Sequence, residues 1–412
     1  MPVLVTAILF LFYVLALVVD HSANFLYGLL FLSGIARIIL SGSSTAPGFR
    51  EMVRRNWPIT LAMAAPLLAV LAHFVFAGHP VWRSMDFPAR LAMFPMIFWA
   101  LQLAPLRWLR CMQWVLVMGA AVGAVKMYLL TGGGHTRDVS TLIPLNILAE
   151  MILSIGVLAA GSITWENRAG ALGVLLKLSA LGAAFYAITL SGTRGAWLTV
   201  PALAALACAV FFRRGVRLKH LAAGAAVFVA CAVLAWQTGD IVKQRFAVAN
   251  SDIQQYTRGS NVDTSLGIRL QLWRGSWIMF RDHPLAGVGS TGFIPALKEL
   301  AARKTISPMA ATFTHSHNDI LFMMAKYGCF GLIAILALYL VPAIIFGRYL
   351  SDPDKEIHGC AFMGVAYIVG LMIYGLSDVA FSGWEVAPFH VTTIAFLLAY
   401  IEKRQAHLHS ID

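Results

Sequence analysis

Long apolar stretches alternate with short polar connections along this 412-residue chain. Several stretches reach the ~20 residues that a helix needs to cross a hydrocarbon core of ~30 Å. We predict spans at residues 1–19, 23–41, 58–78, 87–105, 111–131, 142–163, 171–190, 196–212, 220–238, 319–347, 358–377 and 389–401. The pattern predicts an all-α, polytopic integral membrane protein with about twelve transmembrane helices. The first stretch lacks a basic start and a small-residue cleavage site, so we expect a permanent anchor.

The composition supports the bilayer as the solvent of this chain. Hydrophobic residues make up 59% of it and charged residues 12%, whereas about a quarter of a soluble domain is charged. The net charge of +12 arises from short basic clusters at the ends of apolar stretches, which is typical of membrane orientation and not of nucleic-acid binding. All five cysteines fall inside predicted spans without a CxxC pair, so we expect no disulfide framework, metal or cofactor.

Lysine and arginine distinguish the two sides of the predicted bundle. One set of connections is rich in them and is therefore expected to be cytoplasmic. It holds Arg50, Arg54, Arg55, Arg107, Arg110, Arg168, Arg213, Arg214, Arg217, Lys219, Arg348, Lys355, Lys403 and Arg404. The opposite short connections hold few, namely Arg83, Arg90, Arg137 and Arg194, and are expected to face the periplasm or cell exterior. We therefore expect a multi-pass protein of a bacterial inner membrane, surrounded by membrane lipids.

One outer connection, residues 239–318, is far longer than the others. It divides the chain into spans one to nine (1–238), a large periplasmic loop (239–318), and spans ten to twelve with a short cytoplasmic tail (319–412). A loop of this length predicts local helices or a function of its own. Arg269, Trp273, Trp277 and Phe280 share one helical face, which His283 and Pro284 end. Either an interfacial amphipathic helix or a packed lid helix fits this pattern.

The first candidate site is the outer stretch from Ser191 to Gly195, at the start of a predicted helix. Unpaired amide groups at a helix N-terminus bind anions, and Arg194 would add a bidentate fork for phosphate. The alternative is structural: Ser191 and Thr193 cap the helix while Arg194 reaches lipid headgroups.

The second candidate site lies immediately before span ten, from Thr314 to Asp319. Ser316 and Asp319 fit a helix start signal that would orient the two intervening polar side chains. A histidine held here suits a general base near neutral pH. Polar capping by His315 and His317 is the structural alternative. A metal is less favoured, because no third ligand has a recognisable spacing.

Two further motifs lie in the outer connections. Asp378 ends an apolar span, and either it or Glu385 can orient an arginine or histidine. The stretch from Gly287 to Gly292 matches GxGxxG, but it follows His283 and Pro284 in an external loop, so a turn is expected instead of a dinucleotide site.

These motifs together resemble one enzyme family. They are SGTRGAWL from Ser191, GIRLQLWRGSWIMFRDHPLAGVGSTGF from Gly267, and HSHNDILFMMAKYG from His315, and they resemble the O-antigen ligase and polymerase family. Its members are multi-span bacterial enzymes, similar to other membrane glycosyltransferases with polyprenyl donors (GT-C-like). They move glycans from undecaprenyl pyrophosphate to an acceptor at the periplasmic face. The resemblance covers the helical plan in outline and is sharp from residue 191 to 328.

The resemblance also implies roles for particular residues. Arg194 and Arg269 are similar to the family's pyrophosphate-binding arginines, and His317 is similar to its catalytic histidine, acting without a metal. We also count His315, Asn318 and Asp378 as substrate-binding candidates. The implied donor is undecaprenyl-pyrophosphate-linked O-antigen, and the implied acceptor is the lipid A-core oligosaccharide.

Three alternatives to ligation stay open at this stage. An O-antigen polymerase is supported by the spacing of Arg281 from Gly292, although polymerases commonly have two large external loops. A protein O-oligosaccharyltransferase often carries a further periplasmic region near its C-terminus, where this chain has only a short tail. A lipid-linked oligosaccharide transporter should place its binding groups near the bilayer midplane, whereas here they gather outside.

The charge asymmetry generates the first testable prediction, that both termini are cytoplasmic and residues 239–318 are periplasmic. A single cysteine introduced at Gln255 should react with a membrane-impermeant maleimide in intact cells. A cysteine introduced at Lys403 should react only after the membrane is opened. The reverse pattern would invert the orientation and misplace the candidate site.

Overall fold

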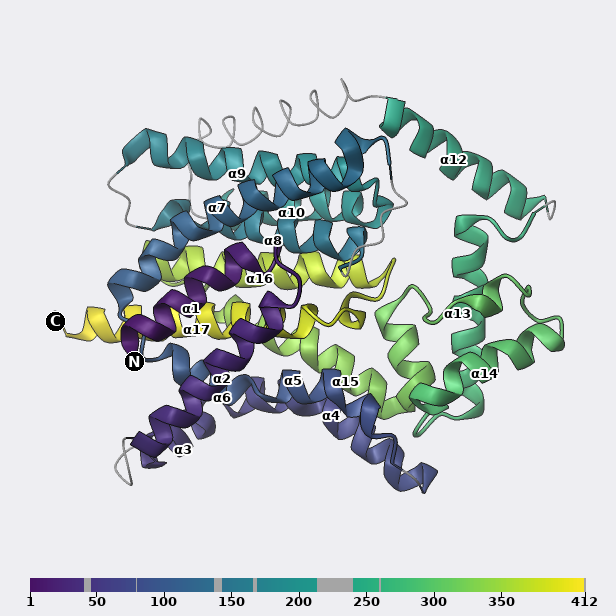
Figure 1. The fold of residues 1–412 in the computed structure, drawn as a ribbon, viewed down its shortest axis with the longest axis horizontal. Helices are drawn as coiled ribbons and strands as arrows, with labels where there is room; N and C mark the ends of the chain where they lie inside the picture. Colours follow the sequence, from purple (N-terminus) through teal and green to yellow (C-terminus); the bar gives the residue numbers. More distant parts are fainter. Residues whose placement is uncertain are drawn as a thin grey trace.

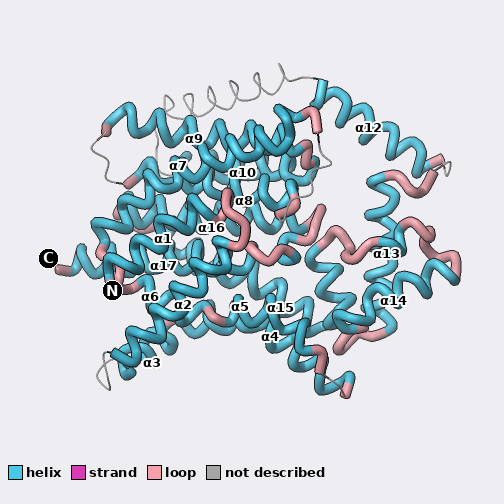
Figure 2. The backbone as a smooth tube through the Cα atoms, viewed as in Figure 1, coloured by secondary structure: helices cyan, strands magenta, loops and turns pink. Residues whose placement is uncertain are grey.

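The computed structural model describes residues 1–40, 46–78, 80–136, 143–165, 169–212, 240–258 and 261–410. Within these ranges the regular structure is helical throughout, and no strand occurs (Figure 2). The predicted all-α class is therefore confirmed.

Sixteen α-helices follow one another along the described chain. They are α1 (Pro2–Leu15), α2 (Ser22–Leu40), α3 (Ala46–Arg55), α4 (Trp57–Ala77), α5 (Asp86–Ala92), α6 (Phe94–Leu101), α7 (Leu106–Thr131), α8 (Leu145–Gly161), α9 (Gly170–Ser191), α10 (Arg194–Phe212), α12 (Asp240–Thr257), α13 (Ser265–Asp282), α14 (Gly289–Ala302), α15 (Asp319–Tyr349), α16 (Lys355–Gly375) and α17 (Val386–His409).

Seven of the described helices are long and apolar enough to cross a membrane, namely α2, α4, α7, α8, α9, α15 and α16. Helix α1 and residues 199–210 of α10 are apolar but shorter. These helices make the chain a polytopic membrane protein. The predicted span at 220–238 lies outside the described residues.

One predicted span is wrong as a single helix. Residues 87–105 form α5 and α6, which meet at Met93. Pro95 explains the break, because a proline has no amide hydrogen to donate to the carbonyl of Leu91 one turn earlier. The short basic helix α3, which ends at Arg54 and Arg55, was not predicted.

The spanning helices run side by side, and both termini lie at the same end of the bundle (Figure 1). Helices α8 and α16 form its centre: 83% of the spanning window of each is buried, against 33% for α2, α4 and α9. At the end of the bundle opposite the termini, Asn146 lies in the first turn of α8, and Asp378 follows the last turn of α16. The best-buried helices therefore position the candidate site.

A carboxylate joins three helices at the end of the bundle that holds the termini. Glu356 of α16 accepts hydrogen bonds from Arg110 of α7 at 3.0 Å and from the hydroxyl of Tyr400 in α17 at 3.0 Å, and Arg404 lies 3.3 Å away. Several donors around one buried carboxylate offset the cost of removing it from water. This contact fixes the central helix α16 along its axis.

The long connection has helices of its own, as predicted. Helices α12, α13 and α14 extend beyond the other end of the bundle, and α13 lies across the bundle direction (Figure 1). Leu272 and Met279 of α13 form a separate apolar core with Phe293 and Leu297 of α14 and with Ala325 of α15. Helix α13 is thus a packed helix seated on α15. Its placement in a membrane interface stays a prediction.

Candidate active site

The first turn of α15 orients the candidate histidines. Asn318 is its N-cap, and the side-chain oxygen of Asn318 accepts a hydrogen bond from the amide of Leu321 at 3.0 Å. The predicted cap at Ser316 is wrong, because the hydroxyl of Ser316 donates to the carbonyl of Asn318 at 2.7 Å. The side-chain amide of Asn318 also donates to the carbonyl of Leu376 at 3.1 Å. Asn318 therefore ties the start of α15 to the loop that follows α16.

His317 has a backbone conformation that L-residues rarely adopt, with φ of 53°. Two hydrogen bonds hold it there. The indole of Trp273 in α13 donates to the carbonyl of His317 at 3.4 Å, and the amide of His317 donates to Nδ1 of His315, also at 3.4 Å. Such backbone strain persists only where surrounding contacts impose it, and it is concentrated at functional sites.

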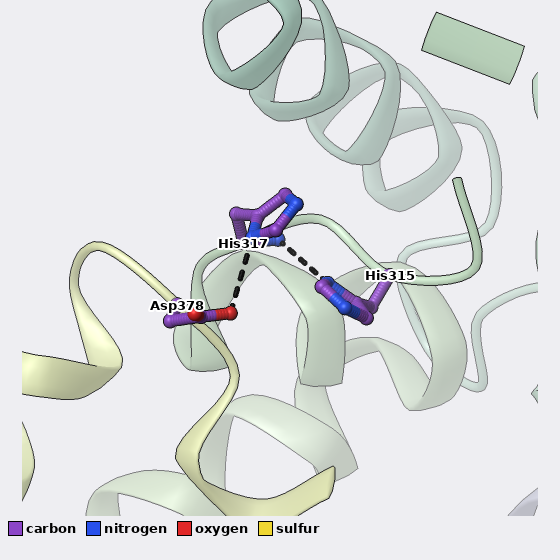
Figure 3. Close-up of side chains that lie close together, drawn as sticks. All are labelled: His315, His317 and Asp378. Carbon is purple, nitrogen blue, oxygen red and sulfur yellow. Dashed lines mark hydrogen bonds and ion pairs between the residues drawn. The ribbon is translucent and has the colours of Figure 1, made fainter. Parts of the chain in front are cut away.

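The imidazole of His317 pairs with the carboxylate of Asp378 (Figure 3). Nδ1 of His317 lies 3.0 Å from Oδ1 of Asp378, and the two side chains are only 17% and 13% exposed. An ionised carboxylate can only accept a hydrogen bond, so Nδ1 carries the hydrogen. In the neutral form of the ring the lone pair is then on Nε2, which is the arrangement that a general base requires.

Asp378 is itself held by neighbouring donors. The amide of Asn146, at the start of α8, donates to Oδ2 at 2.5 Å, and the backbone amide of Val379 donates to Oδ1 at 2.9 Å. Burial raises the pKa of Asp378, but the hydrogen bond and positive charge from His317, together with the Val379 amide, outweigh it and hold the pKa at about 2. The carboxylate is therefore ionised at physiological pH.

A second buried carboxylate fixes the loop that carries Asp378. Asp319 accepts a hydrogen bond from the hydroxyl of Tyr339 at 2.6 Å and from the backbone amide of Ala380 at 3.2 Å. It thus connects the first turn of α15 to the residues just after Asp378. The sequence indicated Asp319 only as part of a helix start, because its partner amides lie 61 and 62 residues away.

His315 is the neutral neighbour of this pair. Its ring centroid lies 4.3 Å from that of His317. Burial, followed by the positive charges of His317 and Arg269, lowers the pKa of His315 to about 4. Because His315 is uncharged near neutral pH, it adds little competing positive charge beside His317.

The two candidate arginines differ in how far the structure places them. Arg269 lies on α13, one turn before Trp273, and its charge acts on His315. Its guanidinium donates to the hydroxyl of Ser265 at 3.2 Å. Arg194 begins α10 as predicted, after Gly192 ends α9 with φ of 59°, but the side chain of Arg194 lies outside the described residues. Its approach to the histidines stays a prediction.

The same side chains form a possible metal-ligand group. Donor atoms of His315, His317 and Asp378 all lie within 4.8 Å of one another. Sequence spacing missed the third ligand because 61 residues separate Asp378 from His317. A metal shared by the three side chains would compete with the hydrogen bond between His317 and Asp378.

The GxGxxG stretch is a turn followed by a helix. Gly287 and Gly289 have φ of 66° and 79°, and α14 begins at Gly289. A Cβ atom at Gly287 would lie 2.4 Å from the carbonyl carbon of Lys326, so this glycine allows the turn to pack on α15. The preceding element is helix α13 and not a strand, so the context of a dinucleotide fingerprint is absent here.

Comparisons with known proteins concern the same part of the chain. Residues 179–336 match the family model described as O-antigen ligase. This range contains Arg194, Arg269 and His317 but ends before Asp378. A Haemophilus influenzae protein described only as uncharacterized is 27% identical over 191 residues, which cover 46% of this chain and 47% of the relative. The match therefore spans about half the length of that relative.

The lowered pKa of Asp378 generates a prediction about stability. A carboxylate whose pKa falls from 3.8 to about 2 on folding contributes about 2 kcal/mol to the free energy of unfolding at pH values above its unfolded pKa. This contribution is lost as the pH falls toward the folded pKa. We expect the stability difference between wild type and Asp378→Asn to be constant from about pH 7 to pH 5 and to be roughly halved near pH 3. Thermal unfolding of the purified proteins in detergent would measure it. A stability difference between the two proteins that stays constant down to about pH 3 would contradict this prediction.

Proposed function

We propose that this chain is a membrane enzyme of the O-antigen ligase family, whose model residues 179–336 match, and that it joins O-antigen to a lipid acceptor. The proposed donor is O-antigen linked to undecaprenyl pyrophosphate, and the proposed acceptor is the lipid A-core oligosaccharide. We place the reaction at the periplasmic face of the inner membrane. This extends the polysaccharide and lipid-linked substrates that membership of the family implies.

The hydrogen bond between His317 and Asp378 carries the proposal. Nε2 of His317 removes the proton from an acceptor hydroxyl as the oxygen of that hydroxyl bonds to the anomeric carbon of the donor. The bond from this carbon to the pyrophosphate oxygen breaks, and its electron pair leaves with undecaprenyl pyrophosphate. The proton stays on the imidazolium, which Asp378 stabilises, until water takes it up.

The arginines supply the second part of the chemistry. Pyrophosphate gains negative charge as it leaves, and planar guanidinium groups match its oxygens through paired hydrogen bonds. Arg269, whose charge already acts on His315, is the described candidate. Arg194 is proposed as its partner from the start of α10. With these cations on the leaving group, the proposed mechanism is independent of a metal.

Arg281 gives little support for the alternative that the chain is an O-antigen polymerase. Its guanidinium pairs with the adjacent Asp282 at 3.0 Å, and the Arg281 side chain is 67% exposed. It is thus largely exposed to solvent in the last turn of α13. The ligase is the reaction that the site residues support best.

Substitution of the histidines tests the proposed base. Removal of a general base typically costs ~10²–10⁴-fold in rate, so His317→Ala should lower kcat by that factor. His315→Ala should cost less, because His315 supports the backbone of His317. Purified protein, labelled lipid-linked glycan at saturation and acceptor glycolipid would measure kcat, with the exposed His283→Ala as the matched control. If His317→Ala has the kcat of wild type, His317 is not the general base. If the substitution raises only the KM for the donor, His317 contributes to donor binding.

Substitution of the arginines tests the stabilisation of the leaving group. Arg269→Ala and Arg194→Ala should each reduce transfer at least ~10²-fold, and lysine should rescue only partly because it lacks the planar fork. Arg274→Ala, at an exposed position on the same helix as Arg269, is the control. EDTA should leave the wild-type rate unchanged. Inhibition by EDTA that an added divalent ion reverses would favour the metal-ligand group over the arginine mechanism.

A further inference from the structure

A cavity of about 460 Å³ lies beside the candidate active site. Residues of α4, α5, α14 and α15 line it, together with the loop between α16 and α17, and we call it the α4–α15 cavity. His315 and Asp319 form its boundary with the active site. The lining described includes no residue of α13, the helix that carries Arg269 and Trp273. The cavity and Arg269 therefore approach the histidine pair from different elements.

The charged groups of the cavity have an excess of positive charge. Arg90 is paired with Asp86 at 3.1 Å, and Asp319 is engaged by Tyr339 and by backbone amides. Within the described ranges, the two remaining cations, Lys326 and Arg83, have no carboxylate partner. An anion that enters the cavity would therefore find two uncompensated charges.

Lys326 is placed to be the main contact for such an anion. It lies two turns into α15 from Asp319, and its ammonium group is 4.7 Å from the ring centroid of Phe322 and 5.3 Å from that of Tyr327. Aromatic rings only partly replace the water that a half-buried ammonium such as that of Lys326 loses. Ser290 and Thr291, in the first turn of α14, line the same cavity and add hydroxyl donors at the positive end of a helix dipole.

The remaining walls indicate what carries the anion. Pro66, Ile335 and Leu338 make one part of the lining apolar. Trp384 lines the cavity as well and remains 55% exposed, which leaves ring surface that can stack on a sugar. Cationic, aromatic and apolar walls together fit a phosphorylated glycolipid better than a free inorganic ion.

We propose that the α4–α15 cavity binds a phosphate group of the acceptor glycolipid, with Lys326 and Arg83 as its cationic contacts. This inference rests on the proposed function. In a direct displacement the acceptor hydroxyl approaches opposite the leaving group, so an acceptor site should not share its walls with Arg269. The cavity meets this condition, and His315 at its boundary brings a bound acceptor next to His317.

Binding measurements test the cavity without any need for turnover. The probes are lipid A-core glycolipid and the same glycolipid after phosphatase treatment, titrated against the purified full-length protein in detergent. Lys326→Gln should weaken binding of the phosphorylated probe roughly tenfold and leave the dephosphorylated probe within about twofold. Lys326→Arg should retain the preference for phosphate. Lys298→Gln, at an exposed lysine of α14, should behave as wild type.

Three results would overturn the inference. The first is an unchanged Kd of Lys326→Gln for the phosphorylated probe, and the second is an equal rise in Kd for both probes. The third is that Lys326→Gln weakens binding of undecaprenyl-pyrophosphate-linked glycan and leaves binding of the acceptor glycolipid unchanged. The third would assign the cavity to the donor. If wild type binds the phosphorylated probe selectively but transfers no glycan, the proposed function fails while the cavity assignment stands.

Discussion

The hydrogen bond between His317 and Asp378 is the interaction on which the candidate site depends. It joins the start of α15 to the end of α16 across 61 residues of sequence, so it forms only when these two helices pack in opposite directions with their ends level. The position of α16 is fixed at the far end of the bundle by Glu356 and its donors. The chemistry at one end of the protein therefore depends on packing along the whole length of its central helices.

Two buried carboxylates with different partners have different roles around this bond. Asp378 accepts from an imidazole, an amide side chain and a backbone amide, so it stays ionised and orients the ring of His317. Asp319, two residues after His317, accepts from a phenol and backbone amides and holds the loop in place. The positive φ of His317 is the strained element that these contacts maintain. The surrounding helices hold His317 in this strained conformation.

Local patterns in the sequence predicted much of the fold and part of the site. Hydrophobic length identified most of the spanning helices, and helical periodicity identified the face of α13 that carries Arg269 and Trp273. The pairing of Asp378 with His317 was not predictable from spacing, because the bond depends on how distant helices pack. The cap at Asn318 was misplaced by two residues, since Ser316 and Asn318 are both good capping types and only tertiary contacts decide between them. The length of the apolar stretch does not reveal the break at Met93, which depends on the missing amide hydrogen of Pro95.

Charge around the histidine pair explains why one of the two histidines should be neutral. A glycosyl transfer from a pyrophosphate needs positive charge at the leaving group and an unprotonated nitrogen at the acceptor hydroxyl, and these needs conflict when the groups are close. The structure separates them: Arg269 approaches from α13, Lys326 lies in the neighbouring cavity, and the uncharged His315 stands between the cavity and His317. Asp378 adds a negative charge that favours a proton on His317 once it has been abstracted. A cation in place of His315 would oppose that proton, so the proposed reaction favours a neutral side chain at this position.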